Sequence, residues 1–239
     1  MSTMTSQAFS ERIKTGLGPR LKSVILFGSA ASGDHAGKRS DYNVLVVLDR
    51  LGLEELKVLS PLVRLWVKSG NPTPLLFTSK TLEKSVDAFP LEFAGIKESH
   101  HVLFGEDVVR DITVRTDSLY MELEHELKGK LMQLRGRYLM TQDQPAAVTE
   151  LMIRSLSTFL TLFRGALRLY QREIPVKKLE ALAALATHIS IDTGVFETIV
   201  RLKAGEKVQG AVPDKLFAQY LQAIESVVEA VDTVLHSKR

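Results

Sequence analysis

The spacing of apolar and polar positions divides the chain into two regions with different periods. In the first region, short apolar runs bounded by turn residues predict buried strands. These strands are expected at residues 23–27, 41–48 and 73–77. The run at residues 44–48 is apolar at every position, which is typical of a strand covered on both faces of a sheet. Helices are expected at residues 10–21 and 52–68, the second from apolar side chains three or four residues apart.

From about residue 117 onward, the apolar positions follow a helical period almost throughout. Five helices are expected, at residues 117–138, 145–167, 177–188, 193–202 and 214–236. Each carries one hydrophobic stripe, a pattern that predicts a helical bundle. The predicted fold class is therefore α+β, with an N-terminal mixed sheet and flanking helices followed by a C-terminal helical bundle. We expect domains at residues 1–112 and 113–239.

Composition narrows the class of protein further. The 239 residues are 45% hydrophobic and 25% charged, as in ordinary globular proteins. The chain has no cysteine, which excludes disulfides, thiolate zinc sites and cysteine nucleophiles and is consistent with a reducing cytoplasm. No apolar run approaches the roughly 20 residues that span a bilayer, and the first ten residues lack the pattern of a signal peptide. We therefore expect neither membrane insertion nor export.

The charge balance favours a small anionic ligand over a polymer. The formal net charge is only +3, and basic residues are not clustered in a run. Binding to nucleic acid by counterion release needs lysine and arginine gathered on one face, so a nucleic-acid partner is not expected. A nucleotide-sized anion fits the sequence better.

One stretch carries recognisable chemistry. An apolar strand ends in Gly28-Ser29, a pair that can present backbone N–H groups and a hydroxyl to a phosphate at the start of a following helix. After a spacer, Asp41 and Asn43 introduce the next strand, where residues two apart project from the same face. A divalent cation held there could bridge to phosphates bound at the Gly-Ser turn.

These residues resemble the nucleotidyltransferase superfamily, which includes aminoglycoside nucleotidyltransferases, polymerase-β-like enzymes and minimal nucleotidyltransferases. The resemblance covers residues 24–49 and implies that Gly28 and Ser29 bind the triphosphate of an NTP. It also implies that Asp41 is the catalytic residue and a magnesium ligand, with Asn43 at the second metal position. A helical domain after the catalytic sheet is similar to the substrate-binding half of several such enzymes.

Lys38 and Arg39 directly precede Asp41 in the chain. They could contact phosphate and are kept as candidate nucleotide-binding residues. A solvated pair of loop cations explains them equally well.

The sequence departs from the family pattern at two positions. Asn43 stands where the family has a second aspartate, and an amide offers a neutral oxygen without a bridging charge. The third family carboxylate would be expected on the strand at residues 73–77, which contains no acid. Asp34 in the spacer could take the place of this third carboxylate. Asp49 is a poor substitute, because it would lie about 20 Å along the strand from Asn43.

Two interpretations remain open. The first is an enzyme that uses magnesium to transfer a nucleoside monophosphate to a hydroxyl of a small molecule or protein. The second is a non-catalytic nucleotide-binding or protein-interaction module, because losing a general base alone costs about 10²- to 10⁴-fold in rate. The helical half could bind substrate or form a homo-oligomer. His100 and His101 are interpreted as surface or helix-end residues, since adjacent helical residues point about 100° apart.

Overall fold

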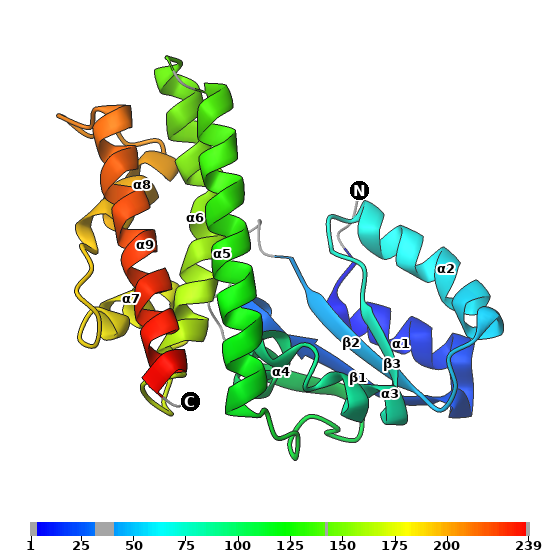
Figure 1. Cartoon of the computed structure of the whole chain (residues 1–239). Coiled ribbons are helices and arrows are strands. Elements are labelled where there is room, and N and C mark those ends of the chain that lie inside the picture. Colours follow the sequence, from blue (N-terminus) through cyan, green and yellow to red (C-terminus); the bar gives the residue numbers. More distant parts are fainter. Residues whose placement is uncertain (1–3, 32–40, 142, 238–239) are drawn as a thin grey trace. The chain divides into compact units, whose positions relative to one another are not determined.

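The computed structural model describes residues 4–31, 41–141 and 143–237, with the backbone alone at Ser29 and at 235–237. Contacts divide the chain into two compact units, Met1–Ser118 and Leu119–Arg239. The first contains the sheet and the second is helical (Figure 1).

In the part of the chain that the structure describes, the sheet unit contains a mixed four-stranded sheet. Its strands are β1 (Leu21–Phe27), β2 (Asn43–Leu48), β3 (Leu75–Thr78) and β4 (His100–Gly105), in the spatial order β3-β2-β1-β4. β1 is antiparallel to both β2 and β4, and β2 is parallel to β3. Residues 44–48 are buried without interruption, as expected for a central strand.

Helices cover both faces of this sheet and account for its two hydrophobic cores (Figure 1). On one face, α1 (Ser6–Leu17) and α2 (Leu53–Lys68) pack on alternate residues of β1 and β2. There Phe9 stacks on Trp66, with ring centroids 4.3 Å apart. On the other face, α3 (Ser79–Ser85) and α4 (Pro90–Glu98) cover the remaining residues of the same strands.

The first helix and the last strand of the sheet differ from the prediction. The helix expected at residues 10–21 instead spans Ser6–Leu17, because the Thr5 side chain caps its start and Gly18, at φ +55°, ends it. Residues 100–105 form strand β4, which the sequence did not predict. His100 lies just past the end of α4, with its Nδ1 3.0 Å from the Ile96 carbonyl, and His101 is exposed, so their interpretation as helix-end or surface residues is confirmed. β4 is only partly buried along its length and gives no clear apolar alternation.

The helical unit confirms the predicted bundle. Its helices in the described residues are α5 (Thr116–Thr141), α6 (Pro145–Leu167), α7 (Lys178–Leu185), α8 (Gly194–Lys203) and α9 (Pro213–Ser237). α6 is central and contacts α7, α8 and α9. By length and hydropathy alone, α6 could cross a membrane. The sequence did not predict this, because α6 contains no continuous apolar run long enough to span a bilayer. Here its apolar residues form the middle of the bundle core, and core helices pass the same test.

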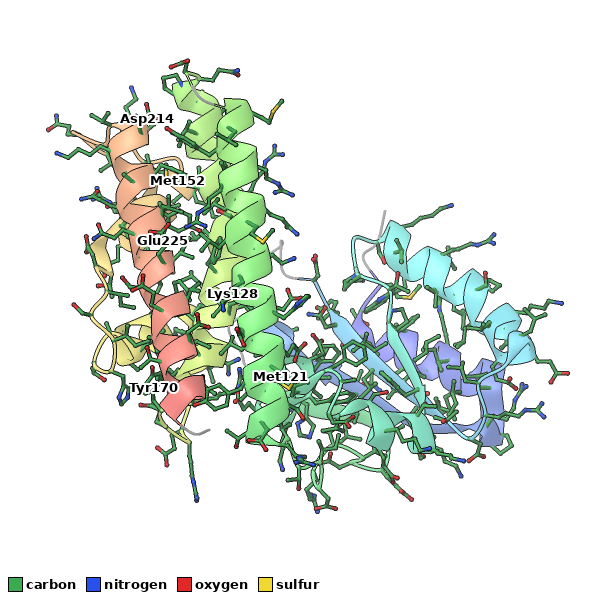
Figure 2. The ribbon with its side chains drawn as sticks, viewed as in Figure 1. Met121, Lys128, Met152, Tyr170, Asp214 and Glu225 are labelled. Carbon is green, nitrogen blue, oxygen red and sulfur yellow. The ribbon has the colours of Figure 1, made fainter. Side chains whose placement is uncertain are left out.

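Polar contacts connect α5 to α9 along their length. Figure 2 labels one residue of each contact: Lys128 on α5, and Asp214 and Glu225 on α9. Lys128 lies 2.8 Å from Asp232, and Arg135 lies 2.7 Å from Glu225. Tyr138 donates a hydrogen bond of 3.1 Å to Asp214. Residue numbers rise along α5 as they fall along α9, so the two helices run antiparallel.

Candidate functional site

The predicted phosphate-binding turn lies where β1 ends. A single 3₁₀ turn, Gly28–Ala30, follows Phe27 directly. Gly28 has φ +77°, a conformation that residues with a Cβ atom rarely adopt. The sequence therefore needs glycine here to make the sharp change from strand to turn.

Ser99 holds this turn from the start of β4. The Gly28 N–H donates to the Ser99 carbonyl oxygen at 3.1 Å, and the Ser99 hydroxyl donates back to the Gly28 carbonyl at 3.3 Å. Ser99 is buried, at 9% exposure, so these bonds are shielded from water. The turn is thus fixed by both backbone polar groups of its first residue.

Asn43 meets the turn from the neighbouring strand. It pairs with Phe27 across the antiparallel β1–β2 ladder. A Cβ atom at Gly28 would lie 3.3 Å from the Asn43 Nδ2 atom, so the amide packs against the glycine. Asn43 and Gly28, which belong to the two separate halves of the motif, therefore lie side by side.

Asp41 lies two residues before Asn43 and is exposed to solvent. The segment that carries it is anchored from the loop before β3, where the buried Asn71 accepts a hydrogen bond of 3.1 Å from the Tyr42 N–H. That loop is anchored in turn by Trp66, whose Nε1 donates to the Pro72 carbonyl at 2.8 Å. β2 begins only at Asn43, so Asp41 lies before the strand and not on it as expected. The hydrophobic core beneath α2 thus sets the position of the segment that leads into β2.

The residues that the structure describes do not form a two-ion metal cluster. β3 lies beside β2 and parallel to it, where the third family carboxylate was sought, and neither β3 nor residues 71–74 contain an acid. Within the described part of the chain, no group of three or more His, Asp or Glu residues could hold a metal ion. Asp41 and the Asn43 carbonyl remain, a set suited to one magnesium ion that also takes phosphate and water ligands.

The remaining candidates fall outside what the structure describes. Lys38 and Arg39, like Asp34, lie in residues 32–40, outside the described ranges. At Ser29 the backbone belongs to the 3₁₀ turn, and its hydroxyl stays a prediction.

Sequence reasoning missed a second set of polar residues behind the turn. His100 pairs with Phe27 in the β1–β4 ladder, and its Nε2 lies 3.1 Å from Asp107 Oδ1. Partial burial opposes ionisation of Asp107, but hydrogen bonds from His100 and from the backbone N–H groups of Val109 and Arg110 outweigh it and lower its pKa. The apolar run at residues 102–104, followed by Gly105, was the signal that could have revealed β4 and this cluster.

Comparison with known proteins identifies the fold. No protein-family model and no curated protein matches the chain. A crystal structure of spectinomycin adenyltransferase AAD(9) from Enterococcus faecialis, with ATP and spectinomycin, aligns with a TM-score of 0.58. It covers 98% of this chain and 100% of that chain, at 13% sequence identity.

A toxin-antitoxin structure with AMP-PNP also aligns, with a TM-score of 0.30 at 18% identity. The alignment covers 55% of this chain and 99% of that chain, but the score is too low to bear on the fold. The similarity to the adenyltransferase shows the fold alone. This chain has a nucleotidyltransferase-like α+β fold.

Proposed function

We propose that this chain binds a nucleoside triphosphate, with the phosphates held at the Gly28–Ala30 turn. The observation that carries the proposal is the packing of Asn43 against Gly28, which brings the Gly-Ser turn and the Asp41-x-Asn43 segment to one place. A glycine turn lets a phosphate approach the backbone closely, and backbone N–H groups suit an anion.

The donor chemistry favours binding over two-metal transfer. One carboxylate and one amide provide a single negative charge for cations, and neither is positioned with a third acid among the described residues. Metal clusters that act on phosphoryl groups stabilise both the attacking and the leaving oxygen, which requires two ions. Among the described residues, the donor set therefore supports phosphate binding better than two-metal transfer.

A second candidate function is slow transfer of a nucleoside monophosphate to a hydroxyl of a small molecule. Two observations favour it: Asp41 is exposed at the turn's end of β2, and the spectinomycin adenyltransferase matches both units of this chain. In that case Asp41 would ligate one magnesium ion, which would supply charge neutralisation of the phosphates. The lack of cysteine is consistent with either function in the cytoplasm.

Calorimetric titration with ATP and with GTP, each with and without magnesium, separates these functions. Asp41→Ala removes the candidate metal ligand. Asp49→Ala is its matched control, because Asp49 is an exposed carboxylate just past the other end of β2, paired with Lys22 at 3.0 Å. Nucleotide binding that persists without magnesium and in both variants supports the binding function.

Magnesium-dependent binding that Asp41→Ala alone abolishes would instead favour the transfer function. It would direct a search for acceptors with labelled nucleotide. Absence of binding to either nucleotide under all conditions would refute both functions.

A further inference from the structure

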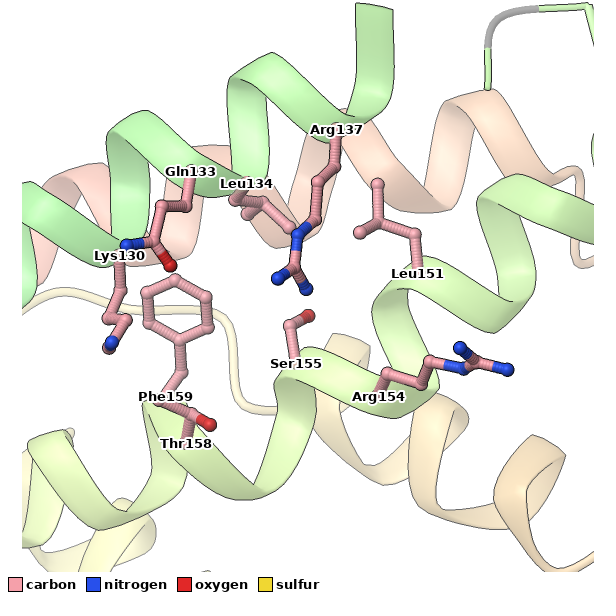
Figure 3. A pocket seen from close by; sticks show the side chains of 9 residues that line it. All are labelled: Lys130, Gln133, Leu134, Arg137, Leu151, Arg154, Ser155, Thr158 and Phe159. Atoms are coloured by element: carbon pink, nitrogen blue, oxygen red, sulfur yellow. The ribbon is translucent and has the colours of Figure 1, made fainter. Parts of the chain in front are cut away.

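The helical unit contains a groove between α5 and α6 that neither proposed function uses (Figure 3). It consists of two adjoining cavities of about 180 Å³ and about 680 Å³. Gln133 and Arg137 of α5 and Leu151 and Arg154 of α6 line both cavities. We call this feature the α5–α6 groove.

The spacing of residues along both helices directs polar groups into the smaller cavity. On α5, Lys130, Gln133 and Arg137 recur at intervals of three and four residues and so share one face. On α6, Leu151, Ser155 and Thr158 do the same. The two faces oppose each other, and Figure 3 shows the Arg137 guanidinium reaching across toward Ser155.

The smaller cavity is positively charged. Lys130, Arg137 and Arg154 line it, and none of its nine lining residues is an acid. Arg154 pairs with Glu150 at 2.5 Å and Lys130 lies 3.8 Å from Glu126, in each case an acid one turn earlier on the same helix. For Arg137, no acidic partner is found among the described residues, so its guanidinium donors are available to a ligand.

Hydroxyl groups complete the cavity wall. Ser155 Oγ donates to the Met152 carbonyl at 3.2 Å and lies 3.1 Å from the Tyr220 hydroxyl. Burial raises the pKa of Tyr220, so the Tyr220 hydroxyl stays neutral. Thr158 is exposed at the cavity, one turn beyond Ser155. The wall thus combines fixed positive charge with neutral hydroxyls.

The larger cavity has a different character. Met140, Ala147 and Leu151 line it with apolar atoms, and its one acid, Glu150, is paired with Arg154. Met140 is 80% exposed, so its side chain is free to cover a ligand. A ligand that fills both cavities therefore has an anionic end and an apolar end.

We infer that the α5–α6 groove binds the phosphate group of a small molecule at Arg137 and Lys130, with an apolar body in the larger cavity. The planar guanidinium fork matches two phosphate oxygens, and lysine adds a point charge. The same chemistry would accept free inorganic phosphate in the smaller cavity alone. All the residues of this site lie in the helical unit, and none belongs to the Gly28 turn.

Calorimetric titration of the full chain with phenyl phosphate and with inorganic phosphate tests the inference. Arg137→Gln is expected to raise the Kd for phenyl phosphate at least about tenfold, because the charge-assisted bonds to Arg137 are lost. The Kd of Arg137→Lys should lie between those of the wild type and Arg137→Gln, because lysine keeps the positive charge but lacks the planar guanidinium group. Arg172→Gln, which removes an exposed arginine of the same unit outside the groove, should leave the Kd unchanged.

Each outcome decides the inference. Tighter binding of phenyl phosphate than of inorganic phosphate supports a phosphate ester, and equal affinity supports free phosphate as the ligand. No saturable binding of either probe at millimolar concentration overturns the site. An equal loss of affinity for phenyl phosphate in Arg137→Gln and Arg172→Gln also overturns the site, because it would indicate only a general effect of net charge. Melting temperatures of the three variants establish that each is folded.

Discussion

Polar groups at the Gly28 turn are held by the backbone, whereas those of the α5–α6 groove are carried by side chains of two helices. At the turn, both hydrogen bonds of Ser99 involve the Gly28 backbone, and Asn43 is placed by its strand register. In the groove, Arg137 and Ser155 come from helices whose backbone polar groups are already satisfied. The turn therefore depends on a glycine at a fixed conformation, at Gly28, whereas the groove depends on side chains that two regular helices present.

The largest expected effect on stability comes from substituting Gly105 in the sheet unit. This residue has φ +78°, and a Cβ atom there would lie 1.8 Å from the Lys22 carbonyl oxygen. We expect Gly105→Ala to reduce the free energy of unfolding by more than about 2 kcal/mol, from left-handed strain and a backbone clash. Urea unfolding followed by fluorescence of Trp66, the only tryptophan, measures this effect in the sheet unit. An unchanged midpoint would contradict the β1–β4 pairing.

The next effect concerns acid stability at the start of α2. Glu55 is buried beside Arg20 and Arg50. A hydrogen bond from the Gly52 N–H, opposed by burial and aided by Arg50, lowers the pKa of Glu55 to about 2. Because the folded pKa is below the ordinary value of 4.5, this carboxylate stabilises the fold above pH 4.5. Its contribution is lost as the pH falls from 4.5 toward 2.

Glu55→Gln should therefore lower stability at neutral pH and flatten its decline below pH 4.5. Glu54→Gln is the matched control, because Glu54 is exposed and pairs with Arg50 at 2.7 Å. Urea midpoints measured from pH 7 to pH 2 compare the two variants. Identical pH profiles for both would refute the special role of Glu55.

A smaller effect sharpens the role of Ser99. Ser99→Ala removes the hydroxyl that donates to Gly28, and a typical hydrogen bond contributes about 1 kcal/mol. Ser69→Ala removes a comparable bond, from a hydroxyl to the Trp66 carbonyl at 2.8 Å. We expect both variants to lose similar stability, while only Ser99→Ala weakens ATP binding, by several-fold. Equal ATP affinities would show that Ser99 is merely structural.

The smallest effect has the opposite sign and lies in the helical unit. Gly129 is inside α5, and a Cβ atom there would meet nothing within 4 Å. Gly129→Ala should raise stability by about 0.5–1 kcal/mol, since alanine loses less conformational freedom in a helix. Thermal unfolding monitored by circular dichroism measures it. Destabilisation would mean that this face of α5 is covered.

Periodicity revealed most of the fold, because each predicted helix of the bundle has a single apolar stripe. The motif of a strand that ends in a glycine turn made Gly28, Asp41 and Asn43 candidates, and their roles stay predictions. Ser99 and Asn71 left no such local signal, because their partners Gly28 and Tyr42 are distant in sequence and are brought close only by the sheet. The α5–α6 groove could not be predicted from the sequence either, because periodicity assigns a residue to a helix face but does not show which helix that face packs against.

The most direct test of nucleotide binding at the turn compares two glycines of the sheet unit. Gly28 and Gly70 both have positive φ, at +77° and +96°, so alanine strains both backbones. Of the two, only Gly28 adjoins Asn43. Calorimetry with ATP should show a Kd at least about tenfold higher for Gly28→Ala and a nearly unchanged Kd for Gly70→Ala. Equal affinities in the wild type and Gly28→Ala would contradict a phosphate site at this turn.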